Sequence, residues 1–234
     1  MNSWPSVLRN WRVNLSLAGI NGVLMAGICG GCLCALALYI KRQHLGVFDL
    51  TGLSYWGQVV STIILFDLTA YVVHRLYHRN KWLWPLHAVH HADIVFETST
   101  ALRFHPLELL LSLGVRLALV WFLGPPILAI VIFEILFAYF NLVEHSDIVF
   151  PQSLERILSP VFITPSMHRR HHSMDERNTP NFGTILSLWD ALFGSLNIRG
   201  LQEVIMVGTP AIRRRDLNLA SLMLHPFLAW RDMR

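Results

Sequence analysis

Four long apolar stretches constrain what this chain can fold into more than any other feature of its sequence. They run from Val13 to Ile40, from Tyr55 to Val73, from Leu107 to Leu123 and from Ile127 to Val143. A helix needs about 20 apolar residues to cross the hydrocarbon core of a membrane. With 53% hydrophobic and 15% charged residues among 234, the chain is too apolar for an ordinary soluble domain. We therefore predict an all-α fold, a multi-pass transmembrane bundle of about four spans that forms one domain over residues 1–234.

The connections between these stretches predict the topology. Gly124-Pro125-Pro126 separates the third stretch from the fourth, so these two form a hairpin that returns to the side where it began. The second stretch ends at His74, and the hairpin lies between His105 and His145. All the segments that carry several histidines therefore share one side of the membrane.

Basic residues predict that this side faces the cytosol. Of the 19 basic residues 17 are Arg, and most lie outside the apolar stretches, as the positive-inside rule describes for cytoplasmic segments. Lys41 and Arg42 fall on the opposite side, which is a mild conflict. The net charge of +4 fits this distribution better than a nucleic-acid partner, and we predict none. The basic residues on the histidine-bearing side are Arg75, Arg79, Lys81, Arg103, Arg156, Arg169, Arg170, Arg177 and Arg213-Arg214-Arg215.

The first apolar stretch is rich in small residues. Gly27 and Gly31 stand at GxxxG spacing, which permits close helix packing. We favour the interpretation that these residues fill a tight bundle over the alternative of a dimerisation motif.

Histidines form the most specific pattern in the sequence. Twelve are present, and His44 and His225 stand alone, which is typical of hydrogen-bonded or interfacial residues. Histidines three or four residues apart share one helix face, with Cβ atoms about 5–6 Å apart, so that two imidazoles can converge on one metal. The other ten, which we predict as metal ligands, are His74, His78, His87, His90, His91, His105, His145, His168, His171 and His172.

The chemistry of this ligand set indicates two metal ions. Imidazoles without nearby thiolates suit iron, copper, zinc or nickel, and a single zinc takes four protein ligands at most. Eight to ten histidines therefore imply a dinuclear centre. Open positions on such a centre suit oxygen activation, which redox-inert zinc cannot perform, so iron is favoured. No histidine is followed by Glu, which excludes the HExxH motif of zinc metalloproteases.

Three polar residues in the apolar stretches are candidates for supporting roles. Asp67 precedes the HxxxH motif on the same helix face, and Glu134 stands in the same relation to Asn141 and the histidine that follows it. Metal-bound histidines usually donate their second ring N–H to a carboxylate or carbonyl. The alternative for the two acids is an interhelical polar clamp with Arg116 or a tyrosine such as Tyr71.

Seven motifs follow one another along the chain: Asp67-x6-His74-Arg75-x2-His78, His87-x2-His90-His91, Arg103-x-His105-Pro106, Asn141-x3-His145, His168-x2-His171-His172, Asn181-Phe182-Gly183 and Trp189-Asp190-x2-Phe193-Gly194. These motifs resemble those of the fatty acid hydroxylase/sterol desaturase superfamily of membrane di-iron enzymes. The resemblance covers residues 67–194 in the family's order. It implies a cytosolic helical cap that holds two iron ions and uses O2 and two electrons to hydroxylate, oxidise or desaturate a lipid such as a sterol, fatty acyl chain or ether lipid.

One position departs from the pattern of the fatty acid 2-hydroxylases. These enzymes carry HxxxH where this chain has Asn141-x3-His145, so one ligand is missing. Either a water held by Asn141 or the imidazole of His105 could complete the set. The Asn form resembles the sterol-modifying and ether-lipid-cleaving branches more closely.

Electrons are expected to come from a separate protein. The chain has no haem module, ferredoxin-type cysteines or dinucleotide fingerprint, so a ferredoxin or cytochrome b5-like donor is implied. The short chain without a fused donor domain favours a bacterial inner membrane over the endoplasmic reticulum.

An alternative function for the same histidines is metal-ion transport or buffering. It would require ligands along the spans, and the apolar stretches contain few.

Overall fold

The computed structural model describes residues 4–29, 31–175, 179–201, 203, 205–212 and 217–233. In these residues the regular structure is helical, apart from two isolated β-bridges. The predicted all-α fold class is therefore confirmed. Arg177 and Arg213–Arg215, which entered the charge argument, lie outside the described residues.

Long helices account for the predicted spans. They are α1 (Trp4–Cys29), α2 (Cys32–Gln43), α3 (Tyr55–Arg79), α5 (Pro106–Leu123) and α6 (Ile127–Glu144). Four helical segments are long and apolar enough to cross a membrane, with α1 and α2 counting as one. These four segments agree with the predicted number of crossings.

The first segment is broken where the sequence predicted one continuous helix. The residue before α2, Gly31, has φ 75°, a left-handed conformation that glycine adopts at little cost. A Cβ added at Gly27 or Gly31 would meet no described atom within 4 Å. The prediction that these glycines fill a tight bundle is therefore wrong, and Gly31 instead permits the turn between the two helices.

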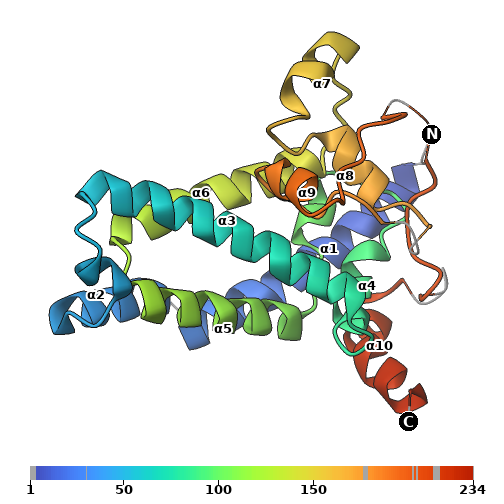
Figure 1. Ribbon diagram of the computed structural model, residues 1–234. Helices are drawn as coiled ribbons and strands as arrows, with labels where there is room; N and C mark the ends of the chain where they lie inside the picture. The colour runs from blue at the N-terminus through green and yellow to red at the C-terminus, as the bar shows by residue number, and fades with distance from the viewer. Residues whose placement is uncertain are drawn as a thin grey trace.

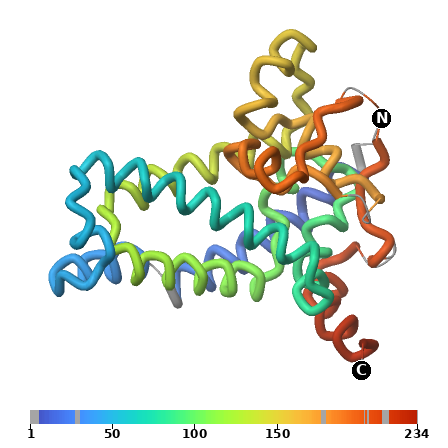
Figure 2. The backbone as a smooth tube through the Cα atoms, viewed as in Figure 1, coloured from blue at the N-terminus to red at the C-terminus, as the bar shows by residue number. Residues whose placement is uncertain are grey.

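The long helices pack so that one end of the bundle collects the histidines. α3 packs against α6, and both α1 and α2 pack against α5. In Figure 1, α3 and α6 lie together above α5, and α2 lies at the end where α5 turns into α6. Buried side chains at the centre include Phe66, Val120, Ile130 and Phe133. The tube in Figure 2 shows both chain ends at the opposite end of the bundle from α2.

At the α2 end, two glycines bring the backbone of one loop against another. A Cβ on Gly46 would lie 2.5 Å from the Cα of Gly124 and 2.6 Å from the carbonyl oxygen of Leu123. Gly124 itself has φ 62° and ends α5, so Pro125 and Pro126 can start the return into α6. The predicted hairpin is confirmed, and its turn is held by the loop before η1 (Val47–Leu50).

Short elements gather at the opposite end and form a lobe against the ends of α3 and α6. They include α4 and α8, each of which carries one HxxHH motif. In Figure 1, α7 projects upward from the lobe and α10 extends downward to the C-terminus. The bounds are α4 (Trp84–His91), η2 (Thr98–Leu102), α7 (Gln152–Leu158), α8 (Pro165–His171), α9 (Leu188–Leu192) and α10 (Leu219–Asp232).

A buried polar network fastens α1 to this lobe. Asn10 and Asn14 donate side-chain hydrogen bonds of 2.9 and 3.1 Å to the carboxylate of Asp93. Arg103 is fully buried and donates to the amide oxygen of Asn14 at 3.0 Å and to the carbonyl of Val89 at 3.0 Å. Because the two buried charges of the network, Asp93 and Arg103, both take part in hydrogen bonds, this network can fix the position of the histidine-bearing α4.

Replacement of Gly46 by Ala should destabilise the bundle, because the new Cβ would overlap backbone atoms that cannot rotate away. We expect a loss of about 1–3 kcal/mol in the free energy of unfolding, as for other overpacked sites. Gly114→Ala is the matched control, because its Cβ would meet nothing within 4 Å in the middle of α5. It should be neutral or stabilising by about 0.5–1 kcal/mol. Equal unfolding midpoints for the two variants in detergent would contradict the close loop contact.

Candidate metal centre

Nine of the ten predicted ligands come together in two adjacent groups. Within each group, one potential ligand atom per residue lies within 4.8 Å of every other. The rings of His91 and His172, one from each group, stack with centroids 4.1 Å apart, so the groups adjoin. The first group is His74, His78, His87, His91 and His171, and the second is His90, His145, His168 and His172.

The helices explain how one motif serves both groups. In α4, His87 and His91 are four residues apart and face the first group, whereas His90 points to the second. In α8 the assignment is reversed: His168 and His172 serve the second group, and His171 serves the first. Each HxxHH motif therefore spans both groups, and α3 and the end of α6 complete the sets.

Backbone carbonyls fix the tautomer of four of these histidines. A carbonyl can only accept, so each Nδ1 in these contacts carries the proton, and the Nε2 of the neutral ring keeps a bare lone pair. Such contacts orient metal-binding imidazoles in known metal sites. The pairs are His74 with Phe182 at 2.8 Å, His90 with Arg103 at 3.2 Å, His145 with Asn141 at 2.7 Å and His171 with Pro180 at 2.8 Å.

The bare nitrogens point at one another rather than at hydrogen-bond donors. The Nε2 atoms of His90 and His145 are 3.1 Å apart, yet neither has a proton to give. Two imidazole nitrogens bound to one ion at about 2.0–2.1 Å lie roughly 3 Å apart, so a shared cation accounts for this spacing. The Nε2 atoms of His78, His91 and His171 are buried without any hydrogen-bond partner. The donor set therefore fits metal ions.

Burial also keeps the imidazoles in the form that binds metal. Removal from water lowers the pKa of His87 to about 3 and that of His145 to about 4. Burial, followed by the charges of neighbouring histidines, likewise lowers the pKa of His90 and His172 well below the ordinary value of 6.5. At pH 7 these rings are neutral, as metal ligation requires.

Two glutamates that the sequence analysis did not single out lie beside the histidines. Glu108 Oε1 is 2.7 Å from His87 Nδ1, and Glu144 Oε2 is 3.5 Å from His168 Nδ1. Both carboxyl groups are buried. Their sequence positions gave a usable signal, because Glu144 immediately precedes His145 and Glu108 lies in the first turn after the RxHP motif.

The supporting roles predicted for Asp67 and Glu134 are wrong, because the carboxylates of these residues bind other partners. Asp67 accepts hydrogen bonds from Trp189 Nε1 at 2.8 Å and from the backbone N–H of Leu186 at 3.2 Å. It therefore anchors α9 and the loop before it to α3. Glu134 forms an ion pair with Arg116 at 2.9 Å, so for this residue the alternative of a polar clamp is confirmed.

Asn141 supports the site through its main chain. Its carbonyl accepts from His145 Nδ1, while its side-chain amide donates to the carbonyl of Ala101 at 3.0 Å. Because a backbone carbonyl is present in every residue, this contact could not be deduced from the Asn side chain.

His105 lies outside both groups, so its prediction as a tenth ligand is wrong. Its Nδ1 accepts from the backbone N–H of Leu107 at 3.2 Å, and its Nε2 donates to the carbonyl of Met223 at 3.2 Å. Both nitrogens are thus occupied in capping α5 and in holding α10. His44 and His225 are also in neither group.

The fold and the site together define a multi-pass helical membrane protein with a buried, histidine-rich site able to bind metal. A sequence model of the fatty acid hydroxylase family matches residues 59–195, which is more than half of the chain. The chain belongs to this family, and the resemblance noted from its motifs is confirmed.

Several characterised proteins are similar to it. Over 142 residues it is 30% identical to the ornithine lipid hydroxylase OlsE of Rhizobium tropici, covering 60% of this chain and 42% of that protein. It is 31% identical over 160 residues to human alkylglycerol monooxygenase (68% and 34%). It is 30% identical over 155 residues to the cholesterol 25-hydroxylase-like protein 1, member 2, of Danio rerio (62% and 52%). The aligned part is thus about half or less of each relative, and no solved structure matches the chain.

Removal of one histidine from either group should cost one metal ion per chain. We expect about two ions per chain in the parent protein and about one in His78→Ala or His145→Ala, measured by elemental analysis after dialysis. His105→Ala is the control and should retain two, because neither of its nitrogens is free for metal. Equal loss in all three variants would contradict the division into two groups.

Glu108→Gln should weaken metal binding, because the His87 ring would lose its carboxylate partner. Loss of such an outer contact typically costs 10–100-fold in metal affinity. A competition titration with a chelator measures the effect. Glu134→Gln serves as a control with a carboxylate that touches no histidine. Equal affinities in the two variants would argue against a supporting role for Glu108.

Acidification should destabilise the metal-free protein. The unfolded chain protonates its histidines near pH 6.5, whereas burial lowers the pKa of His87 and His145 to about 3 and 4 in the folded state. The unfolded state therefore binds more protons below pH 6.5, and the free energy of unfolding falls as the pH drops from 6.5 toward 4. Denaturant midpoints at pH 8, 7, 6 and 5 test this. A midpoint that stays level from pH 7 to 5 would contradict it.

Proposed function

We propose that this chain is a membrane lipid oxygenase that holds two iron ions in the two histidine groups. It uses O2 and two electrons to hydroxylate, or otherwise oxidise, a C–H bond of a lipid. The observation that carries the proposal is the set of nine histidines, seven buried and two half-buried, divided five and four, with bare nitrogens that converge within each group. When bound, a pair of iron ions would supply the oxygen activation that the side chains of the protein cannot perform.

The first histidine group offers five nitrogens and the second four. Metals that prefer oxygen ligands are disfavoured by this all-imidazole set. Among the metals that imidazole suits, iron can supply the oxygen chemistry that the names of the similar monooxygenases and hydroxylases imply. The family membership supports the same choice.

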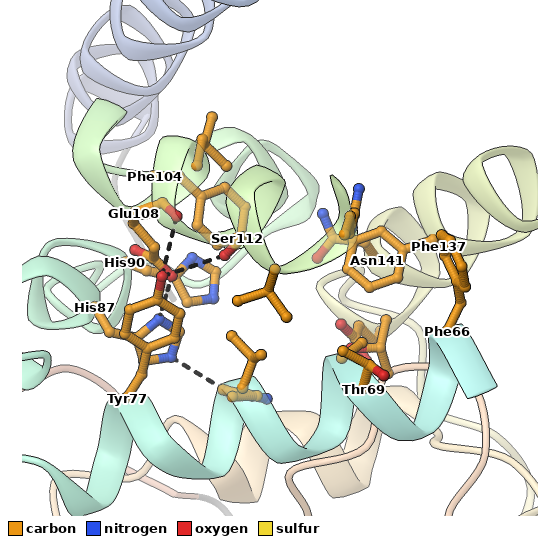
Figure 3. A pocket seen from close by; sticks show the side chains of 18 of the residues that line it. Phe66, Thr69, Tyr77, His87, His90, Phe104, Glu108, Ser112, Phe137 and Asn141 are labelled. Carbon is orange, nitrogen blue, oxygen red and sulfur yellow. Dashed lines mark hydrogen bonds and ion pairs between the residues drawn. The ribbon is translucent and has the colours of Figure 1, made fainter. Parts of the chain in front are cut away.

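A cavity between the membrane helices leads to the histidines and supports a lipid as substrate. It is lined from α3, α5 and α6, and its lining is mainly apolar. In Figure 3, His87, His90 and Glu108 lie at one end, and Phe66 and Phe137 lie at the other. A lipid chain could therefore pass from the bilayer to the site without crossing water.

Aromatic side chains would exclude water from the reacting end. Phe104 stacks on His90 with ring centroids 4.5 Å apart, and Tyr77 stacks on His87 at 5.6 Å. The Tyr77 hydroxyl donates to the backbone carbonyl of Glu108 at 3.0 Å, which holds the ring in place. A dry, apolar environment at the reacting end favours substrate alkyl chains over water and limits side reactions.

The orientation and partners of the enzyme belong to the same proposal. The Arg-rich histidine-bearing lobe would face the cytosol under the positive-inside rule. A separate ferredoxin or cytochrome b5-like protein would supply electrons there. We place the enzyme in a bacterial inner membrane in preference to the endoplasmic reticulum, as one domain over residues 1–234 with its motif-bearing core at 67–194.

Metal transport is the weaker function for these histidines. A conduit needs ligands along the membrane path, whereas the described residues show the two histidine groups together at one end of the helices. The arrangement suits ions that stay in place.

Lipid analysis with isotope labelling tests the proposed oxygenase directly. Lipids from cells that produce the parent protein under 18O2 should contain a species that gains one labelled oxygen. His171→Ala should abolish it, because that imidazole is one of the five in the first group. His44→Ala, at the far end of the bundle, should leave it intact. A labelled product that persists in His171→Ala, or lipids that are identical with and without the protein, would refute the function.

A further inference from the structure

One of the charged side chains that line the cavity forms its ion pair with another long helix rather than with a histidine. The charged residues among its described lining are Glu108, Glu144 and Arg116. The two glutamates stand beside histidines, whereas Arg116 lies in the middle of α5. An ionisable residue at that depth is costly unless it has a partner or a function.

Arg116 is held at the cavity wall by an ion pair and by the aromatic rings of α6. A single nitrogen, Nη1, donates to both carboxylate oxygens of Glu134, at 2.9 and 3.0 Å. The guanidinium carbon lies 4.7 Å from the ring centroid of Phe137, a lining residue at the end of the cavity away from His87 and His90 in Figure 3. The position of the guanidinium is therefore fixed before any ligand binds.

These contacts leave donors available. A guanidinium has five N–H groups, and the hydrogen bonds of Arg116 to described residues use Nη1 alone. The side chain remains 23% exposed. Nε and Nη2 can thus donate to a ligand in the cavity.

The charge of Arg116 is already balanced. An anionic ligand would compete with Glu134 and would bring a third charge into the bilayer, where desolvation is expensive. An uncharged oxygen acceptor, such as an ether or ester oxygen, gains a hydrogen bond to the guanidinium without this cost. The site therefore suits a neutral oxygen function in an otherwise apolar chain.

The helix sets the distance between this donor and the reacting end. Arg116 lies eight residues after Glu108, which touches His87, and eight residues of α-helix rise about 12 Å. An extended alkyl chain advances about 1.25 Å per C–C bond of about 1.5 Å. About ten bonds therefore separate an oxygen at Arg116 from a carbon beside the histidines.

We propose that Arg116 is a specificity-determining residue that hydrogen-bonds an uncharged oxygen of the lipid substrate and so selects lipids that are oxidised about ten bonds from that oxygen. The oxidation step rests on the proposed function, whereas the binding of the oxygen does not.

Binding to metal-free protein in detergent tests the anchor separately from catalysis. The probes are tritiated decyl methyl ether and tritiated dodecane, two chains of 12 heavy atoms that differ by one acceptor oxygen, and their binding is followed by scintillation proximity. The parent protein should prefer the ether at least about tenfold, as expected for one hydrogen bond to a charged group. No preference for the ether in the parent protein would overturn the proposal.

Three variants separate an anchor from a structural clamp. Arg116→Met/Glu134→Met removes the donor without leaving an unpaired charge, and the preference should disappear. Arg116→Glu/Glu134→Arg keeps an ion pair but puts an acceptor at the cavity wall, so the preference should stay lost. Glu134→Gln keeps the guanidinium and should keep the preference. Restoration of the preference by the swapped pair, or its survival in the double Met variant, would overturn the proposal.

The same samples report on folding and on the proposed function. Uptake of two metal ions by each variant shows that the bundle and the histidine groups are intact. If the double Met variant fails this check, the swapped pair and Glu134→Gln still decide the question. An ether preference that depends on Arg116, in a protein that oxidises no lipid once loaded with iron, would refute the oxygenase and leave the anchor standing.

Discussion

The close approach of unprotonated imidazole nitrogens is the constraint on which the rest of this structure depends. Nε2 atoms of two neutral histidines, His90 and His145, stand 3.1 Å apart with their protons committed to carbonyls on the other side of each ring. Without a cation this arrangement gains no hydrogen bond and has lost the hydration of both nitrogens. The fold must therefore hold the rings together against this cost.

Two sets of contacts hold the imidazole rings in place. Backbone carbonyls and buried glutamates orient the rings, and the Asp93–Arg103 network fastens α1 to the same lobe. Arg103 takes part in both sets of contacts. Its guanidinium donates a hydrogen bond to Asn14 in the network, and its backbone carbonyl accepts one from His90 Nδ1. On the membrane side, α3, α5 and α6 leave an apolar cavity that ends at the rings. The histidines are therefore approached through a mainly apolar cavity.

Much of this could be predicted from the sequence because the signals are local. Apolar length predicted the membrane helices and Gly-Pro-Pro predicted the hairpin. The three- and four-residue spacings predicted eight of the nine grouped histidines, and the family motif around Asn141 predicted His145. The failures involve contacts between distant segments. Nothing near His105 in the chain indicates that its Nε2 bonds Met223, 118 residues away. Similarly, helical periodicity placed Asp67 on the same helix face as the histidines. It could not show that the Asp67 carboxylate accepts a hydrogen bond from the distant Trp189.

The most direct test is a crystal structure of the iron-loaded protein with anomalous-difference data collected at the iron absorption edge. The account predicts two iron peaks, one among the five histidines of the first group and one among the four of the second, each with nitrogen ligands at about 2.0–2.2 Å, as for other imidazole-bound metals. A single peak, or iron bound at His105 or elsewhere outside the two groups, would contradict it.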